Sequence, residues 1–181
     1  QRLSGIATLT SAFVKKTQKT GATILDTRKT TPCLRPFERY AVRAGGGRNH
    51  RFGLFDSVLI KDNHIEAAGG VAIAVSRARA GVPAGSLIEV EVTDQRELKE
   101  ALAAGADIIM LDNMSVERIR KAVKLIAKGA LTEASGSMSL DNVGAVARTG
   151  VDFISVGALT HSARSVDISM KVVGHGAKRG R

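Results

Sequence analysis

Polar and small residues stand directly after short apolar runs along this sequence, and these residue types bind anions and take part in acid–base chemistry. Basic residues follow the first two runs, carboxylates stand in or after the next two, and serine or glycine follows the last two. The six runs are Ala22–Leu25, Ser57–Ile60, Leu87–Val92, Asp107–Leu111, Ala130–Thr132 and Phe153–Val156. In parallel α/β folds, ligands bind beyond the carboxyl ends of the strands. The spacing therefore predicts that these side chains meet at one site.

The charges of these side chains divide the predicted site into two flanks. The positive candidates from the first two units are Arg28, Lys29, Arg51 and Lys61. The negative candidates from the next two units are Glu91 and Asp112. Two carboxylates facing basic groups suit a divalent cation held beside a polyphosphate.

Small residues after the fifth and sixth runs add a third kind of group. Ser135-Gly136 and Gly157-Ala158 stand where helices are expected to begin. Backbone N–H groups at such positions bind phosphate, aided by the helix dipole, and barrel phosphate sites favour the late loops. A ligand with carboxylates, a phosphate and a metal-bound pyrophosphate would use all three kinds of group.

The apolar runs are nearly continuous, which is typical of strands covered on both faces. The segments between them have a helical period, for example with Leu98 and Leu102 on one face. Asp94 with Glu97 forms a capping-box pattern at the start of that helix, and Gly105 is expected to end it.

Alternating strands and helices indicate parallel βα units. We expect an incomplete TIM-like α/β barrel of about six units, because six strands fall short of the eight of a closed barrel. A doubly wound open sheet stays open as an alternative, although no Gly-x-Gly-x-x-Gly follows any run, which disfavours its dinucleotide-binding form. The barrel domain is expected over residues 1–172 and a disordered basic tail over 173–181.

The composition suits a globular enzyme with an anionic partner. Of the 181 residues, 44% are hydrophobic and only 3% are aromatic, so the core must be aliphatic. The net charge is +10, and residues 1–61 carry twelve basic but three acidic side chains. Cys33 is the single cysteine, which excludes an internal disulfide and suits a reducing compartment. No apolar run approaches the ~18 residues of a membrane span and no signal peptide is seen, so a cytoplasmic protein is expected.

Six segments resemble, in order and spacing, the signature segments of quinolinate phosphoribosyltransferases. They are Leu25-Asp26-Thr27-Arg28-Lys29-Thr30-Thr31-Pro32, Gly45-Gly46-Gly47-Arg48-Asn49-His50-Arg51, Leu59-Ile60-Lys61-Asp62-Asn63-His64, Glu89-Val90-Glu91-Val92, Leu111-Asp112-Asn113 and Gly157-Ala158-Leu159-Thr160-His161. The resemblance runs from about Arg2 to Met170. Any one segment is weak evidence, but six in register are strong evidence.

The resemblance implies transfer of phosphoribose from phosphoribosyl pyrophosphate to quinolinate, with decarboxylation and with magnesium. It implies that a pyridine dicarboxylate is bound by Arg28, His50, Arg51 and Lys61, and that Thr27 and Lys29 belong to the same segment, with Lys29 near the pyrophosphate. Glu91 and Asp112 match carboxylates that organise the ribose and the metal through water. The 5′-phosphate loops match Ser135, Gly136, Gly157 and Ala158, with Ser137 and His161 beside them. By the same resemblance Lys29, Lys61, Glu91 and Asp112 are the catalytic candidates, and the family forms a homodimer or higher homo-oligomer.

Some positions depart from the family pattern. Cys33 stands where glycine is common, Arg48 replaces a more often apolar residue, and Ser137 would strain its loop if φ is positive there. The family also has an N-terminal α+β domain, whose arginine completes the neighbouring subunit's site. This sequence does not contain that segment, so an inactive fragment is one alternative.

Several candidates have a structural interpretation as well. Arg35, Arg39 and Arg43 are spaced as a solvated helix face, and Asp112 with Asn113 taken alone would be favoured as a helix cap. His64, Cys33 and Glu89 are the weaker candidates of their segments. The Gly45–Gly47 run is expected to end a helix.

Two other functional classes are compared with the enzyme. One is a related pyrophosphorylase acting on another aromatic acid, which a comparison of nicotinate with quinolinate as substrate would distinguish. The other is a nucleic-acid binder, which the charge alone would allow. Tyr40 and the five Phe residues form no interleaved aromatic and basic platform, however, so neither nucleic acid nor a membrane is the expected partner.

Overall fold

Six strands form one sheet, and every neighbouring pair in it is parallel. The computed structural model describes residues 1–172. The strands are β1 (Thr23–Leu25), β2 (Val58–Ile60), β3 (Ile88–Val92), β4 (Ile108–Asp112), β5 (Leu131–Ser135) and β6 (Phe153–Ser155). Their order is β1-β6-β5-β4-β3-β2. This order steps in one direction without the reversal of a doubly wound sheet, so the predicted incomplete barrel is confirmed.

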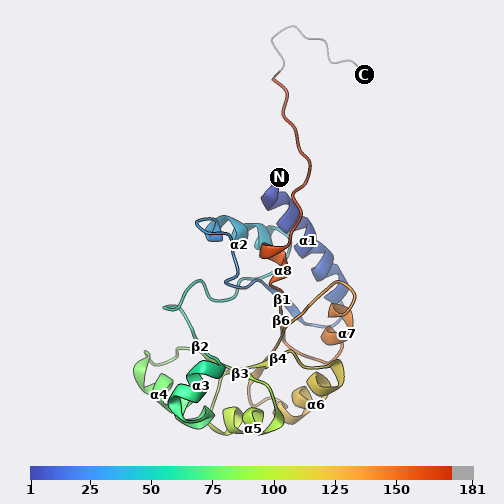
Figure 1. Cartoon of the computed structure of the whole chain (residues 1–181). Coiled ribbons are helices and arrows are strands. Elements are labelled where there is room, and N and C mark those ends of the chain that lie inside the picture. Colours follow the sequence, from blue (N-terminus) through green and yellow to red (C-terminus); the bar gives the residue numbers. More distant parts are fainter. Residues whose placement is uncertain (173–181) are drawn as a thin grey trace.

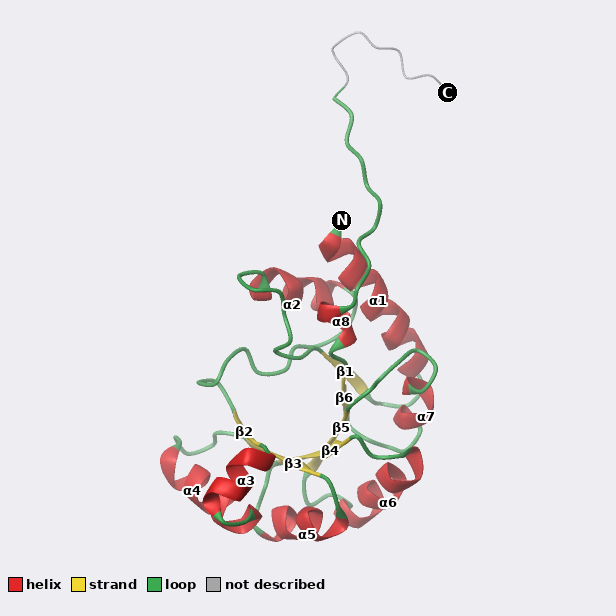
Figure 2. Cartoon of the chain, in the orientation of Figure 1, coloured by secondary structure: helices red, strands yellow, loops and turns green. Residues whose placement is uncertain are grey.

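The sheet curves into an open ring whose two ends are β1 and β2 (Figure 1). A segment without helix or strand, residues 45–57, lies across the open side between helix α2 (Arg35–Ala44) and β2 (Figure 2). We call it the crossing segment. It starts as a continuation of the sheet, because Arg48 donates its N–H to the Ile24 carbonyl at 2.8 Å and accepts the Asp26 N–H at 3.2 Å. The same segment carries His50 and Arg51, so the open side of the ring brings two of the candidate residues to the barrel.

Eight helices accompany the strands in the described residues. They are α1 (Arg2–Thr17), α2 (Arg35–Ala44), α3 (Asp62–Ala68), α4 (Val71–Gly81), α5 (Gln95–Ala103), α6 (Val116–Ile126), α7 (Val143–Ala147) and α8 (Ala158–His161). Helices α4 to α7 lie along the outer side of the ring (Figure 1). The core between sheet and helices is almost wholly aliphatic, as the composition predicts, with Phe13 as its one buried aromatic ring among the described residues. Within residues 1–172, no helix combines the length and the apolar character that crossing a bilayer would need.

The sequence pattern located each strand to within a few residues. Only the fifth differs appreciably, since β5 continues past Thr132 to Ser135. The apolar pattern missed this because Glu133 is buried inside the strand, where its backbone pairs in register with Met110 of β4. Only the tail predicted over 173–181 falls outside the described residues.

The helix signals are mostly confirmed. The Asp94 side chain caps α5 by accepting the Glu97 N–H at 2.8 Å, and Gly105 follows the helix with a φ of 77°. The capping box is incomplete, however, because the Glu97 carboxylate accepts the N–H and hydroxyl of Thr93 instead. Helix α2 ends at Ala44, directly before the predicted glycine run, with Gly46 at a φ of 90°.

Two of the departures from the family pattern lie in strained backbone. Cys33 has a φ of 65° and Ser137 a φ of 48°. A side chain in this region costs roughly 1–2 kcal/mol relative to glycine. Cys33 is exposed, and Arg48 joins the sheet through its backbone while its side chain faces solvent.

Candidate functional site

One cavity of about 710 Å³ opens at the carboxyl ends of the strands. All fourteen site residues predicted from the sequence line it: Thr27, Arg28, Lys29, His50, Arg51, Lys61, Glu91, Asp112, Ser135, Gly136, Ser137, Gly157, Ala158 and His161. The lining also includes Leu59, Met110, Asn113, Glu133, Met138 and Ser155. The parallel sheet explains this convergence, because the carboxyl ends of all six strands face the same way.

The basic flank of the cavity combines the end of β1, the crossing segment and the end of β2. Burial and the nearby charge of Arg28 both lower the pKa of Arg51. A guanidinium group whose pKa is lowered by a neighbouring guanidinium is a favourable place for an anion, since a bound negative charge relieves the repulsion between the two. Arg51 also donates from Nη1 to the Ser57 carbonyl at 3.0 Å, which fixes its head group in the cavity wall.

Two carboxylates lie beside this flank. Glu91 near the end of β3 accepts a hydrogen bond from Lys61 Nζ at 2.5 Å, and Asp112, the last residue of β4, accepts one from the Asn113 side chain at 2.7 Å. Each carboxylate uses one oxygen in that contact, and no donor within residues 1–172 pairs with the other oxygen. Hard oxygen ligands of this kind fit a magnesium ion with several waters.

Asp112 and Asn113 are not helix caps. The N-cap of α6 is Ser115, whose hydroxyl accepts the Arg118 N–H, so the structural interpretation of Asp112 is wrong. The residue is left free to face the cavity, and Asn113, with a φ of 49°, turns the chain away from the strand.

The third side of the cavity consists of two loops with small residues. Gly136 has a φ of 96°, and an added Cβ there would lie 2.2 Å from the Asn113 side-chain oxygen, so only glycine fits. At Gly157 an added Cβ would lie 3.0 Å from His161 Nε2 and 3.5 Å from Lys29 Cδ. The absence of a side chain at Gly157 therefore leaves room for a ligand between His161 and Lys29.

Of the two helix starts predicted at these loops, the one after Gly157 is confirmed and the one after Gly136 is wrong. Helix α8 begins at Ala158, but it has only four residues. The next helix after Gly136 is α7, which begins at Val143, so the 135–137 loop does not open a helix. Backbone N–H groups, rather than a helix dipole, are what this side of the cavity offers an anion.

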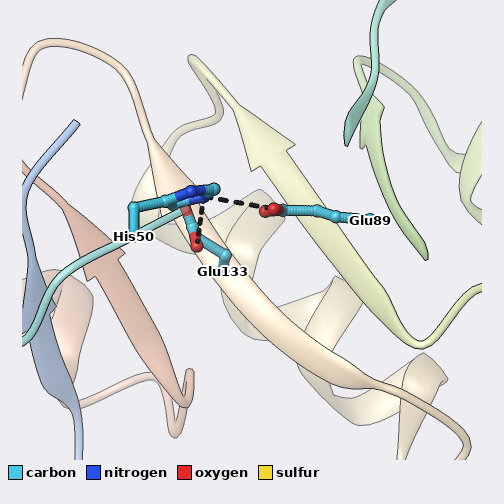
Figure 3. A group of neighbouring side chains, drawn as sticks. All are labelled: His50, Glu89 and Glu133. Atoms are coloured by element: carbon cyan, nitrogen blue, oxygen red, sulfur yellow. Dashed lines mark ion pairs between the residues drawn. The ribbon is translucent and has the colours of Figure 1, made fainter. Parts of the chain in front are cut away.

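Two lining residues of the cavity, His50 and Glu133, form a cluster with the buried Glu89 (Figure 3). The His50 ring points toward Glu89 and Glu133, with Nε2 at 3.1 Å from Glu89 Oε2 and 3.5 Å from Glu133 Oε2. Burial disfavours the charged ring, but the hydrogen bonds and charges of Glu133 and Glu89 outweigh it and raise the pKa of His50 to about 10. Burial also raises the pKa of Glu89, and Glu133 adds to that rise although His50 opposes it.

The contacts of the ring fix its orientation in this cluster. The Arg51 backbone N–H points at His50 Nδ1 at 2.8 Å. Nε2 faces the carboxylates of Glu89 and Glu133. The three side chains also have the spacing of a metal site. A metal-bound histidine donates its other N–H, whereas here the other nitrogen accepts one, so the geometry favours a proton over a metal ion.

The charge of this cluster makes stability depend on pH. Because the folded-state pKa of His50 is raised, its stabilising effect is complete below pH 6.5 and is lost as the pH rises toward 10. Glu133→Gln is expected to lower the pKa of His50. The free energy of unfolding should then decrease less steeply between pH 6.5 and 10. For one proton, the slope of this decrease is at most about 1.4 kcal/mol per pH unit. Urea unfolding across the range measures the slope. The exposed Glu66→Gln is the matched control, and equal slopes in the parent and Glu133→Gln would contradict the assignment.

Sequence reasoning missed the residues that hold the crossing segment in place. Asp26 is fully buried and accepts the His50 N–H at 2.8 Å, and burial raises its pKa. The arginine row predicted as a solvated helix face is confirmed in part: Arg43 is exposed and none of the three lines the cavity, but all three hold the loops beside it. Arg35 donates to the Arg28 and Phe52 carbonyls, Arg39 to those of His50 and Arg51, and Arg43 to the Asn49 side chain. His64 is structural, as expected, since its Nδ1 accepts the Lys61 N–H at 3.0 Å.

Comparison with known proteins shows close relatives. Residues 6–171 match the family described as quinolinate phosphoribosyl transferase, C-terminal domain. The chain is 52% identical over 172 residues to the probable nicotinate-nucleotide pyrophosphorylase (carboxylating) of Bacillus subtilis, covering 95% of this chain and 60% of the relative. It is 48% identical over 171 residues to the nicotinate-nucleotide pyrophosphorylase (carboxylating) of Mycobacterium leprae, covering 93% and 60%.

Solved structures agree with these matches. The crystal structure of NadC from Streptococcus pyogenes superposes with a TM-score of 0.91 at 50% identity, covering 95% of this chain and 60% of that one. The nicotinate-nucleotide pyrophosphorylase of Francisella tularensis gives a TM-score of 0.89 at 50% identity, covering 92% and 59%. The chain thus spans about 60% of the length of the relatives it matches.

Proposed function

Since this chain belongs to the quinolinate phosphoribosyl transferase family, as its C-terminal domain, we propose that it transfers phosphoribose from phosphoribosyl pyrophosphate to quinolinate. The products are nicotinate mononucleotide, pyrophosphate and CO₂. One observation carries the proposal. The 710 Å³ cavity has cations on one flank, two carboxylates beside them and glycine-containing loops on the third side. These are the groups that a dicarboxylate, a ribose and its phosphates require.

Unpartnered polar atoms at the cavity support a polar ligand. Within the described residues, the buried side-chain atoms without a hydrogen-bond partner are Arg51 Nε, Glu89 Oε1, Glu133 Oε1 and Ser155 Oγ. Three of these residues line the cavity, and the fourth, Glu89, contacts the lining residue His50. Buried polar groups are rarely left unpaired, so their collection at a single place is expected of a binding site.

The basic flank binds and orients the two anionic substrates. Arg28, Arg51 and Lys61 carry the charges for the two carboxylates of quinolinate, and His50 holds the cavity wall between them. Lys29, lying over Gly157, is placed for the pyrophosphate leaving group. Positioning two anions side by side in a basic cavity offsets their repulsion and aligns the reacting atoms.

The acidic pair acts on the ribose. Breaking the bond between ribose C1 and pyrophosphate leaves an oxocarbenium-like centre, which Glu91 and Asp112 stabilise through their negative charge. The quinolinate nitrogen forms the new bond to C1. The quaternised ring then accepts the electron pair left when the 2-carboxylate departs as CO₂, and a proton replaces it on the ring carbon.

Glu91 and Asp112 are also the residues that would hold magnesium, through water, because each has one carboxylate oxygen without a protein donor. When bound, the ion supplies positive charge to the pyrophosphate. We further propose that the full-length protein is a homodimer or a higher homo-oligomer.

The proposal is tested by separating binding from turnover. Calorimetry of the purified chain with quinolinate and with phosphoribosyl pyrophosphate should show binding of both, and release of labelled CO₂ with formation of nicotinate mononucleotide shows turnover. Nicotinate as the acceptor is the control for substrate identity. A preference for nicotinate would replace the substrate, and no affinity for either proposed substrate would overturn the function.

A further inference from the structure

A partly buried polar network joins the start of α1 to two loops at the cavity. Arg2 donates from Nη2 to the Thr160 carbonyl at 2.6 Å and to the Thr31 hydroxyl at 2.8 Å, and from Nε to Glu38 Oε1 at 2.7 Å. The second oxygen of Glu38 accepts the Thr31 N–H at 3.1 Å. The Thr160 hydroxyl donates to the Lys29 carbonyl at 2.7 Å. We call these residues, Arg2, Thr31, Glu38 and Thr160, the α1 bridge.

The two loops held by the α1 bridge are far apart in the sequence. One is the 27–31 loop after β1, which carries Lys29, and the other is the turn 157–161 after β6, which carries Gly157 and His161. Strands β1 and β6 are neighbours in the sheet, so the loops leave it side by side. The hydrogen bonds from Thr160 and Arg2 then join them directly.

The cost of this arrangement indicates that it has a purpose beyond packing. Glu38 and Thr160 are fully buried, although Glu38 carries a charge. A carboxylate out of water is costly unless its oxygens are well paired, and here both oxygens are used to hold Arg2 and Thr31. The network contains no residue of the cavity lining itself, so its effect on a ligand must pass through the loops.

We propose that the α1 bridge consists of positioning residues that set the distance between Lys29 and the 157–161 turn, and thereby determine affinity for the phosphorylated substrate. The inference rests on the proposed function for the identity of that substrate. The bridge contacts the 157–161 turn and the Thr31 and Lys29 end of the 27–31 loop, and it makes no contact with Arg51 or Lys61. Arg28, which lies in the same loop and is assigned to quinolinate, is held separately, because its carbonyl accepts a hydrogen bond from Arg35 Nη2 at 3.1 Å. Its loss should therefore weaken phosphoribosyl pyrophosphate much more than quinolinate.

Two conservative variants test the bridge. Thr160→Val removes the bond to the Lys29 carbonyl with almost no change of shape, and Arg2→Lys keeps the charge but cannot reach all three acceptors. Both are expected to weaken phosphoribosyl pyrophosphate by about ten- to a hundredfold in calorimetry, since misplacement of about 1 Å has effects of this size. Quinolinate affinity is expected to stay within about threefold in both.

Arg79→Lys is the matched control. Arg79 also bonds three acceptors, the Asp107 carboxylate at 2.8 Å and the Ser86 and Gly105 carbonyls, but at the opposite end of the strands from the cavity. It should reduce stability as Arg2→Lys does, without changing affinity for either substrate. Equal losses for both substrates in the bridge variants, or an equal loss of phosphoribosyl pyrophosphate affinity in Arg79→Lys, would reduce the bridge to a purely structural role and overturn the proposal.

Hydrogen exchange without any ligand separates this inference from the proposed function. In both bridge variants the amides of residues 27–31 and 157–161 should exchange faster than in the parent, whereas those around Arg51 and Lys61 should not change. Unchanged exchange in these loops would refute the bridge even if the parent binds both substrates. Absence of phosphoribosyl pyrophosphate binding in the parent, with faster exchange in the variants, would instead refute the proposed function and with it the substrate assignment made here.

Discussion

Asp112→Asn is expected to lower turnover by about a hundredfold while quinolinate affinity stays within about threefold. The residue ends β4 at the cavity, and its side chain is held by Asn113 and not by a helix. Asparagine keeps the size of the side chain and an oxygen for that contact, so only the negative charge is lost. The charge is needed where positive charge develops on the ribose, which happens in the transition state and not in the quinolinate complex.

Steady-state turnover and calorimetric affinity, measured on the same preparations, test this difference. Asp141→Asn is the control, because Asp141 is an exposed carboxylate outside the cavity lining. If turnover and quinolinate affinity fall together, Asp112 contributes to binding and not to the ribose step. If neither changes, the residue has no part in the reaction.

Lys61→Ala is expected to weaken quinolinate by about a hundredfold, which corresponds to roughly 2–3 kcal/mol. Two effects add. The variant loses a cation from the basic flank, and it also leaves Glu91, whose side chain is only 13% exposed, without the ammonium group that neutralises it. An unpaired carboxylate beside a bound dicarboxylate repels it.

The two effects can be separated with Glu91→Gln. In that background, Lys61→Ala should weaken quinolinate less than it does in the parent, because no carboxylate is left to be exposed. Lys99→Ala on the exposed face of α5 controls for the change in net charge. Equal effects of Lys61→Ala in both backgrounds would show that the ammonium group acts on the ligand alone, and an unchanged affinity would remove Lys61 from the site.

Local patterns in the sequence were sufficient for the strands and for the lining residues that directly follow them, whereas His50 was assigned by the resemblance alone and Glu133 and Ser155 were not predicted. A run of apolar residues forms a strand where it is covered on both faces, as in β4, where Ile109, Met110 and Leu111 are buried. Because all strands of the sheet are parallel, the residue after each run must lie at the same edge. For this reason the sequence predicts that Thr27 and His161, which are far apart along the chain, line one cavity.

Contacts between distant segments were decided only by the tertiary structure. Glu89, Glu133 and His50 meet because the sheet curves and the crossing segment closes its open side, and no spacing along the chain encodes that meeting. The end of β5 was not predicted, because the buried Glu133 interrupts the apolar pattern that indicates a strand. The pairing of Arg2 with Glu38 was likewise not predicted, because a contact between α1 and α2 depends on how the helices pack.

The sequence by itself determined which residues at the strand ends line the cavity, since parallel strands bring those ends to one edge. The tertiary structure alone decided how those residues are held, by the contacts of His50 with Glu89 and Glu133, by the arginine contacts behind the crossing segment and by the α1 bridge. The physical reason is that hydrophobic periodicity is a local property of the chain, whereas pairing of buried charges depends on which distant segments the folded barrel brings together.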